Sequence, residues 1–175
     1  MSRCTPETAR GRHVFEIAGY SLVRGLGIGN YIRSGTFSVG GYDWCIQYYP
    51  DGNSEDSDSN DWDTQSDEED DDADNDEGYI SVFLTLLSKD ARQVRALCDL
   101  RLVNPATGLS PVMCYSNKKA SGFSGEGSTW GSGKFKLRSE LEASEYLRDD
   151  CLMIQCDLSV ITGMPVSQSE PISDI

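Results

Sequence analysis

Residues 42–52, YDWCIQYYPDG, carry the pattern that decides the fold class. Large apolar side chains occupy every second position: Tyr42, Trp44, Ile46 and Tyr48. Alternation with period two is typical of a β-strand that turns one face toward a core. The strand pattern stops at Pro50-Asp51-Gly52, which is a turn sequence. We therefore expect a strand that is about to reverse direction.

Residues 79–88, YISVFLTLLS, supply the returning strand. Between the two strands, residues 51–77 hold 15 carboxylates and no Lys or Arg, and removing them from the net charge of −14 leaves +1. Self-repulsion and the lack of apolar area predict that residues 53–77 are disordered. Closing a longer loop costs only on the order of 1–2 kcal/mol, so a hairpin tip tolerates such an insertion.

Further strands are indicated on both sides of this hairpin. Residues 11–22 place His13, Phe15 and Ile17 on one face and Val14 and Glu16 on the other, and strand-like runs also occur in residues 93–103 and 151–161. Only residues 138–150 look helical, with a start at Ser139 and with Leu141 and Tyr146 turned inward. About seven short antiparallel strands separated by turns predict an all-β protein, a β-sandwich.

Composition limits the classes of function. The 175 residues (19.3 kDa) suit one domain, and the negative net charge argues against a nucleic-acid partner. No apolar run reaches transmembrane length, so we expect no membrane contact. The six cysteines form no CxxC pair and there is one histidine, which predicts no metal site and no cofactor. We expect a reduced, soluble, intracellular protein.

No catalytic group is indicated. The Gly-rich residues 25–30, GLGIGN, resemble a phosphate loop, but the strand-like YIRSGTF follows where a nucleotide site needs a helix. We expect a turn there. His13 has no nucleophile elbow nearby, which favours a structural histidine over a general base. We therefore predict that the chain is not an enzyme.

The acidic block has three possible roles besides that of a solvated spacer. It lacks the Gly and Glu of an EF-hand loop, which argues against Ca²⁺. Ser57, Ser59 and Ser66 precede acidic residues and would suit an acidophilic kinase. The block could also attract a basic protein, with Trp62 as an anchor. The sequence leaves phosphorylation and the attraction of a basic protein open.

Two aromatic side chains are candidates for ligand contact. Ile80, Val82, Leu84 and Leu86 form the core face of their strand, which leaves Phe83 on the other face between Ser81 and Thr85. Trp130 lies among glycines and serines that could cover little of it. Exposed aromatic rings often mark binding surfaces, although loops could cover both rings instead.

Several stretches together resemble the MATH (meprin and TRAF homology) domain, and the nearest resemblance is to plant MATH–BTB proteins related to the speckle-type POZ protein. The stretches are HVFEIAGYSL, IRSGTFSVGGYDWCIQYYPDG, YISVFLTLL, VRA, WGSGKF and YLRDDCLMIQCDLSV. The resemblance implies a TRAF-like antiparallel sandwich of about eight strands with one short helix. It also implies the substrate-recognition domain of a cullin-RING ubiquitin ligase adaptor, which holds an extended Ser/Thr-rich peptide in a shallow groove by strand addition.

The resemblance also implies site residues. Phe83 falls at an aromatic groove position, and Trp130 and Gly131 match the family's Trp-Gly. Cys98, Ser121 and Ser132 fall where the best-studied relative has aromatic rings, so the peptide preference should differ. For Cys98, strand parity favours an inward position beside Leu100 instead.

The resemblance sets the expected domain plan: a tail at residues 1–10, a MATH domain at 11–162 with the insertion at 53–77, and a linker at 163–175. Partners would be substrate proteins carrying short linear motifs, and a cullin only through a BTB domain absent from this chain. We expect the domain to be monomeric and to work in the nucleus, the cytoplasm or both. The alternative is a standalone scaffold, or a binder of basic proteins through the acidic block, without delivery to a ligase.

Overall fold

The computed structural model describes residues 3–53, 78–90, 93–110 and 113–163. In these residues the chain forms eleven strands and two short helices. In chain order they are β1 (Glu7–Ala18), α1 (Tyr20–Val23), β2 (Ile32–Arg33), β3 (Phe37–Val39), β4 (Tyr42–Tyr49), β5 (Tyr79–Leu86), β6 (Val94–Val103), β7 (Met113–Ser116), β8 (Ser121–Phe123), β9 (Thr129–Leu137), α2 (Arg138–Glu142), β10 (Leu147–Arg148) and β11 (Cys151–Gly163).

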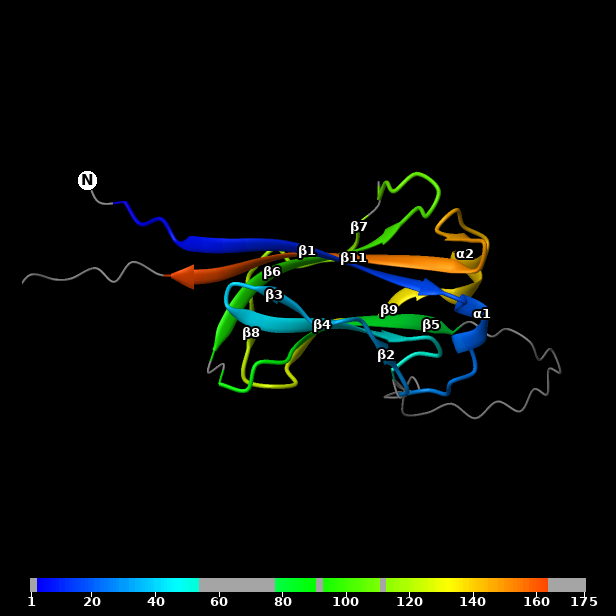
Figure 1. Ribbon diagram of the computed structural model, residues 1–175, viewed down its shortest axis with the longest axis horizontal. Coiled ribbons are helices and arrows are strands. Elements are labelled where there is room, and N and C mark those ends of the chain that lie inside the picture. The colour runs from blue at the N-terminus through cyan, green and yellow to red at the C-terminus, as the bar shows by residue number, and fades with distance from the viewer. Residues whose placement is uncertain (1–2, 54–77, 91–92, 111–112, 164–175) are drawn as a thin grey trace, which may run out of the picture.

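Two antiparallel sheets pack face to face as two layers (Figure 1). The first sheet has the order β1-β11-β6-β7, with β10 paired to β11 and β8 paired to β6. The second sheet has the order β2-β4-β5-β9, with β3 paired to β4. The all-β sandwich expected from the alternation is confirmed. Both ends of the described chain lie at one end of the sandwich, and α1 and α2 lie at the other (Figure 1).

The core lies between the sheets and consists of the alternating residues that the sequence indicated. Trp44 is fully buried, meets Phe123 edge-on with ring centroids 5.0 Å apart, and donates from Nε1 to the Val39 carbonyl. The inward faces of β5 and β11 are at most 1% exposed: Ile80, Val82, Leu84, Leu86, Leu152, Ile154, Cys156, Leu158 and Val160. At about 1.5–3 kcal/mol per large side chain, this burial is the main stabilising term.

The hairpin around the acidic block is confirmed, because β4 pairs with β5 from Trp44 opposite Leu86 to Tyr49 opposite Ser81. The buried Arg138 holds both ends of the insertion. Its guanidinium donates to the Pro50 carbonyl and lies 3.7 Å from the Asp51 carboxylate, and its backbone N–H donates to the Gly78 carbonyl. The predicted disorder of residues 53–77 concerns positions that, apart from Asn53, lie outside the described residues.

The helices differ from the expectation. The second helix begins at Arg138, with Leu137 as its N-cap and no side-chain cap, so the start expected at Ser139 is wrong. Leu141 is fully buried and Tyr146 partly buried, as expected. The one-turn helix α1 carries no periodic signal and was not foreseen. It follows Gly19 at φ 99°, a backbone conformation that favours glycine, and the Gly19 and Tyr20 N–H groups both donate to the Asp150 carbonyl.

Candidate functional site

Strand β9 is an edge of the second sheet, because in the described residues only β5 pairs with it. The Leu86 N–H donates to the Ser128 carbonyl. Bonded and non-bonded pairs alternate along an antiparallel ladder. The backbone groups of Thr129 and Gly131 therefore point away from β5. Such an edge can accept a further strand.

Phe83 lies on the outer face of the second sheet, opposite Gly131 on β9. Its ring meets Tyr49 of β4 edge-on, with centroids 5.7 Å apart. The outward orientation expected from strand parity is confirmed. The face is more covered than expected, because Phe83 is half-buried and its polar neighbours Ser81 and Thr85 are 0% and 3% exposed.

Gly131 leaves room for the Phe83 ring. A Cβ built at this position would collide with the Val82 carbonyl oxygen and lie 2.7 Å from Phe83 Cα and 3.0 Å from its ring atom Cδ1. Glycine is therefore required here because of close strand approach. Ser132 is the next residue along β9 and pairs with Val82; its Oγ accepts from the Lys134 N–H at 3.2 Å.

Trp130 lies on the opposite face of the sheet from Phe83. It pairs with Leu84, a fully buried core residue, and its indole packs on Tyr115 of β7 with ring centroids 4.8 Å apart. Trp130 is half-buried. Tyr115 therefore supplies cover that the sequence did not suggest, since no periodic pattern places β7 beside β9.

Cys98 and Ser121 lie on the first sheet and are joined through Asn117. The Asn117 side chain accepts from the Cys98 N–H at 2.7 Å and donates to the Ser121 hydroxyl at 3.0 Å. Cys98 is 2% exposed, so the inward position that parity favours is confirmed. Its hydrogen bond with the Cys156 thiol, 3.5 Å between sulfur atoms, and its burial raise the pKa of Cys98. Ser121 is half-buried.

The six candidate residues thus fall into three groups around the β7–β9 side of the sandwich. Phe83 and Gly131 share the outer face, Trp130 and Ser132 share the inner face, and Ser121 lies on the first sheet with Cys98 beneath the surface. Strand β7 links the last two groups, through Tyr115 on Trp130 and through Asn117 just after the strand. Tyr49, Tyr115 and Asn117 are the neighbours that sequence reasoning missed.

The Gly-rich loop binds an internal anion. The N–H groups of Gly25 and Gly27 donate to the two carboxylate oxygens of Asp51, at 3.1 and 2.7 Å. The loop is therefore a turn that docks on the end of β4, as expected.

His13 stacks on Phe37 with ring centroids 4.4 Å apart, and burial lowers its pKa. Stacking accounts for this histidine without a catalytic partner.

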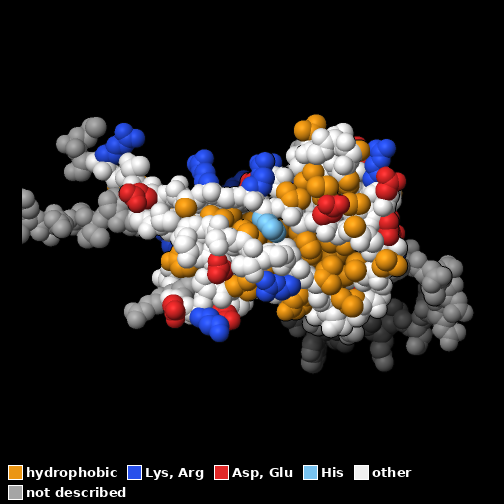
Figure 2. All heavy atoms as spheres, in the orientation of Figure 1, with side chains coloured by type: hydrophobic (Ala, Val, Ile, Leu, Met, Phe, Trp, Pro, Cys, Tyr) orange, Lys and Arg blue, Asp and Glu red, His pale blue; other side chains and the backbone are white. Residues whose placement is uncertain are grey.

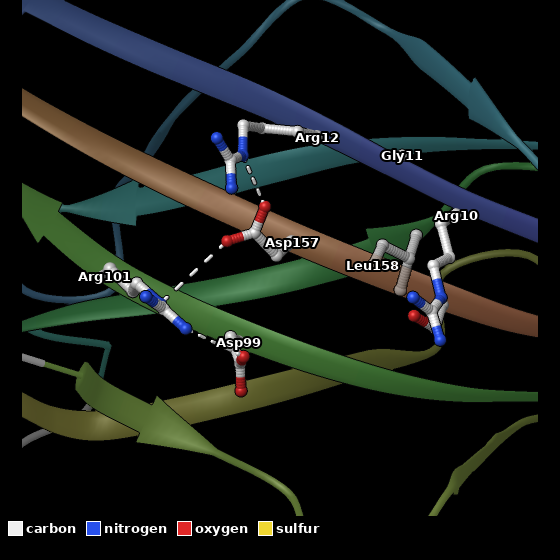
Figure 3. A pocket seen from close by; sticks show the side chains of 8 residues that line it. Arg10, Gly11, Arg12, Asp99, Arg101, Asp157 and Leu158 are labelled. Carbon is white, nitrogen blue, oxygen red and sulfur yellow. Dashed lines mark hydrogen bonds and ion pairs between the residues drawn. The ribbon is translucent and has the colours of Figure 1, made fainter. Parts of the chain in front are cut away.

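A charged hollow lies on the outer face of the first sheet, over β1, β11 and β6 (Figure 3). Arg12 donates to Asp157 at 2.6 Å, and Arg101 lies 3.9 Å from Asp157 and 3.2 Å from Asp99. Burial alone would raise the pKa of Asp157, but hydrogen bonds from Arg12 and Gln155 outweigh it and lower that pKa. The lining also includes Arg10, so three arginines face two aspartates and the hollow carries one positive charge in excess.

No group of three or more His, Cys, Asp or Glu side chains in the described residues could hold a metal ion. No helix in the described part of the chain is long and apolar enough to cross a membrane.

Comparison with known proteins adds family information. The sequence model of the MATH domain family matches residues 12–61 and 69–158 of this chain. The chain is 40% identical over 168 residues to the BTB/POZ and MATH domain-containing protein 6 of Arabidopsis thaliana, which covers 93% of this chain and 36% of that protein. It is 38% identical over 163 residues to the BTB/POZ and MATH domain-containing protein 4 of Arabidopsis thaliana. That match covers 90% of this chain and 31% of that protein. The chain spans about a third of the length of these relatives.

Proposed function

Since the chain belongs to the MATH domain family, we propose that it recognises substrate proteins by adding an extended peptide to the open edge of β9. The observation that carries this proposal is the position of the two rings. Trp130 of the edge strand β9 faces inward, and Phe83 of the neighbouring strand β5 faces outward beside Gly131. A strand added at that edge sends alternate side chains to each face and so meets both rings.

The chemistry of the two faces suggests the kind of peptide. The inner side combines the tilted Trp130–Tyr115 ring pair with the Ser121 and Asn117 side chains, which suits a mixture of apolar and hydroxyl-bearing residues. Cys98 would lie below the peptide as part of the floor. Ser132 and Ser121 are smaller than aromatic rings, so the peptide preference should depart from that of the family's best-known Ser/Thr-rich motif.

The adaptor role extends the same proposal. The relatives' names join a MATH domain to a BTB/POZ domain. In a protein of that plan, this domain would capture the substrate and a BTB domain would contact a cullin, in the nucleus or cytoplasm.

A fluorescent Ser/Thr-rich peptide of the family type tests the site. Anisotropy titrations should give saturable binding that Trp130→Ala weakens at least tenfold and that Leu109→Ala, a change at an exposed apolar side chain in the β6–β7 turn, leaves unchanged. Binding of equal strength to both variants, with a steep loss at high salt, would favour the acidic block instead.

Backbone N-methylation of the peptide tests strand addition directly. Only alternate amides of an added strand face β9. Methylation should therefore abolish binding at every second position and have little effect between them. A uniform response along the peptide would contradict pairing with β9.

A further inference from the structure

Helix α1 and the loop between α1 and β2 expose large apolar side chains. We call the side chains of Leu22, Leu26, Ile28 and Tyr31 the apolar loop surface; they are 86%, 44%, 50% and 46% exposed. Hydrophobic side chains gather at the end of the molecule that carries α1 (Figure 2). A concentration of exposed apolar area in one short segment commonly marks an interaction site.

This loop is held in place by hydrogen bonds. Besides the two bonds to Asp51, the Gly29 N–H donates to the Gly52 carbonyl at 2.9 Å and the Asn30 side chain donates to the Leu26 carbonyl at 2.9 Å. The apolar loop surface is therefore presented by an ordered backbone, which lowers the entropic cost of binding.

A row of rings connects this surface to the open edge of β9. Tyr31 lies 5.2 Å from Tyr49, and Tyr49 lies 5.7 Å from Phe83, between ring centroids. Phe83 in turn lies opposite Gly131, which has no side chain to interrupt the path. Phe83 and Tyr49 lie on the outer face of the second sheet, and Tyr31 contacts Tyr49 from the loop before β2. The row crosses the sheet from the edge strand β9 to the loop before β2.

We propose that the apolar loop surface binds a second, apolar segment of the same substrate peptide that adds to β9. This inference rests on the proposed function and names a further feature of the ligand. Four strand spacings of about 4.8 Å separate an added strand from β2, roughly 19 Å. An extended chain covers that distance in about six residues. The preferred substrate therefore carries large aliphatic or aromatic residues about six positions from the segment that pairs with β9.

A series of labelled peptides tests this. Each peptide contains the Ser/Thr-rich core and is extended at one end, either the amino or the carboxyl end. Six residues beyond the core it carries two leucines or two serines. A third version carries the two leucines only two residues beyond the core. The leucine version at one end should bind about tenfold more tightly than its serine counterpart, because two anchored segments share one chain. The two-residue version should gain little.

Matched variants assign the gain. Leu26→Ser with Ile28→Ser should remove it while leaving the affinity for the serine version within twofold. Leu97→Ser with Leu109→Ser, which alters side chains exposed elsewhere to 39% and 66%, should keep it.

Four results would overturn the inference. If the leucines raise the affinity at neither end, or if the rise in affinity persists in the Leu26→Ser, Ile28→Ser variant, the apolar loop surface does not bind a second segment. Binding of the core peptide at β9 would be unaffected by either result. Dimerisation of the wild type that the loop variant abolishes, measured by sedimentation, would assign the surface to a second copy. Failure of the core and of every extended version to bind would overturn the proposed function as well.

Discussion

Phe83 and Trp130 lie one position apart in the β5–β9 ladder but on opposite faces of the sheet, with Phe83 opposite Gly131 and Trp130 opposite Leu84. A ligand resting on one face could contact only one of them. A ligand that continues the sheet at the β9 edge contacts both, since its side chains alternate. This relationship is why we favour strand addition over a pocket on either face.

Gly131→Ala should destabilise the domain. The added methyl group would meet the Val82 carbonyl oxygen and the Phe83 backbone, neither of which can move without disturbing the β5–β9 pairing. We expect a loss of about 1–3 kcal/mol in the free energy of unfolding, measured by urea denaturation. Gly122→Ala in β8 is the matched control, because nothing lies within 4 Å of the added atom. Equal stabilities of the two variants would contradict the close approach.

The fold was largely predictable because strands that bury one face in a two-layer sandwich carry apolar residues at every second position. The strands around Trp44, Leu84 and Ile154 each bury one face and carry the period-two signal. The short pieces were not predictable in the same way. Helix α1 and the two-residue strand β2 are set by hydrogen bonds from other parts of the chain, such as those to Asp150, and a single sequence carries no periodic trace of them.

The candidate site was predictable only in part. Parity placed Phe83 outward and Cys98 inward, because both belong to long, regular strands. For Trp130 the sequence left open whether the ring is exposed or covered by loops, and the cover comes instead from Tyr115, which packs on it from the other sheet. Contacts between residues distant in sequence, such as this pair, depend on how the sheets pack and leave no local pattern.

Asp51→Ala should be strongly destabilising. The Asp51 carboxylate accepts from the Gly25 and Gly27 N–H groups and lies 3.7 Å from the buried Arg138 guanidinium. Its removal leaves two loop donors without their acceptor and takes a counter-charge from a buried cation. We expect a loss of about 2–4 kcal/mol in the free energy of unfolding, measured by chemical denaturation.

Glu140→Ala is the control for that experiment. It breaks an exposed ion pair with Lys136, which lies 3.2 Å away, and exposed pairs contribute about 0–1 kcal/mol. If Asp51→Ala cost no more than Glu140→Ala, the loop would not depend on its internal anion.

His13 should make stability depend on pH near neutrality. Burial lowers its pKa in the folded state, so between that value and about 6.5 the unfolded chain binds more protons than the folded one. The free energy of unfolding should therefore fall as the pH drops below about 6.5. Because His13 is the single histidine, NMR titration of one imidazole gives its pKa directly, and His13→Gln should flatten the pH dependence between pH 5 and 7. A measured pKa above 6.5 would reverse the sign.

Replacing residues 54–77 by a short Gly-Ser linker separates the two candidate partners of this chain. Asn53 is tied to Ser81, and Gly78 is tied to Arg138, so both ends of the insertion are anchored within the sandwich. The variant should fold with a stability within about 2 kcal/mol of the parent, because loop closure varies only with the logarithm of length. Peptide binding at β9 should persist with the same affinity, whereas any binding of a basic protein, tested with a Lys-rich peptide at two salt concentrations, should disappear with the carboxylates.

Loss of peptide binding in a folded variant would instead make the acidic block part of substrate recognition. An unfolded variant would mean that the block contributes to the fold, against the interpretation that it is a tolerated insertion.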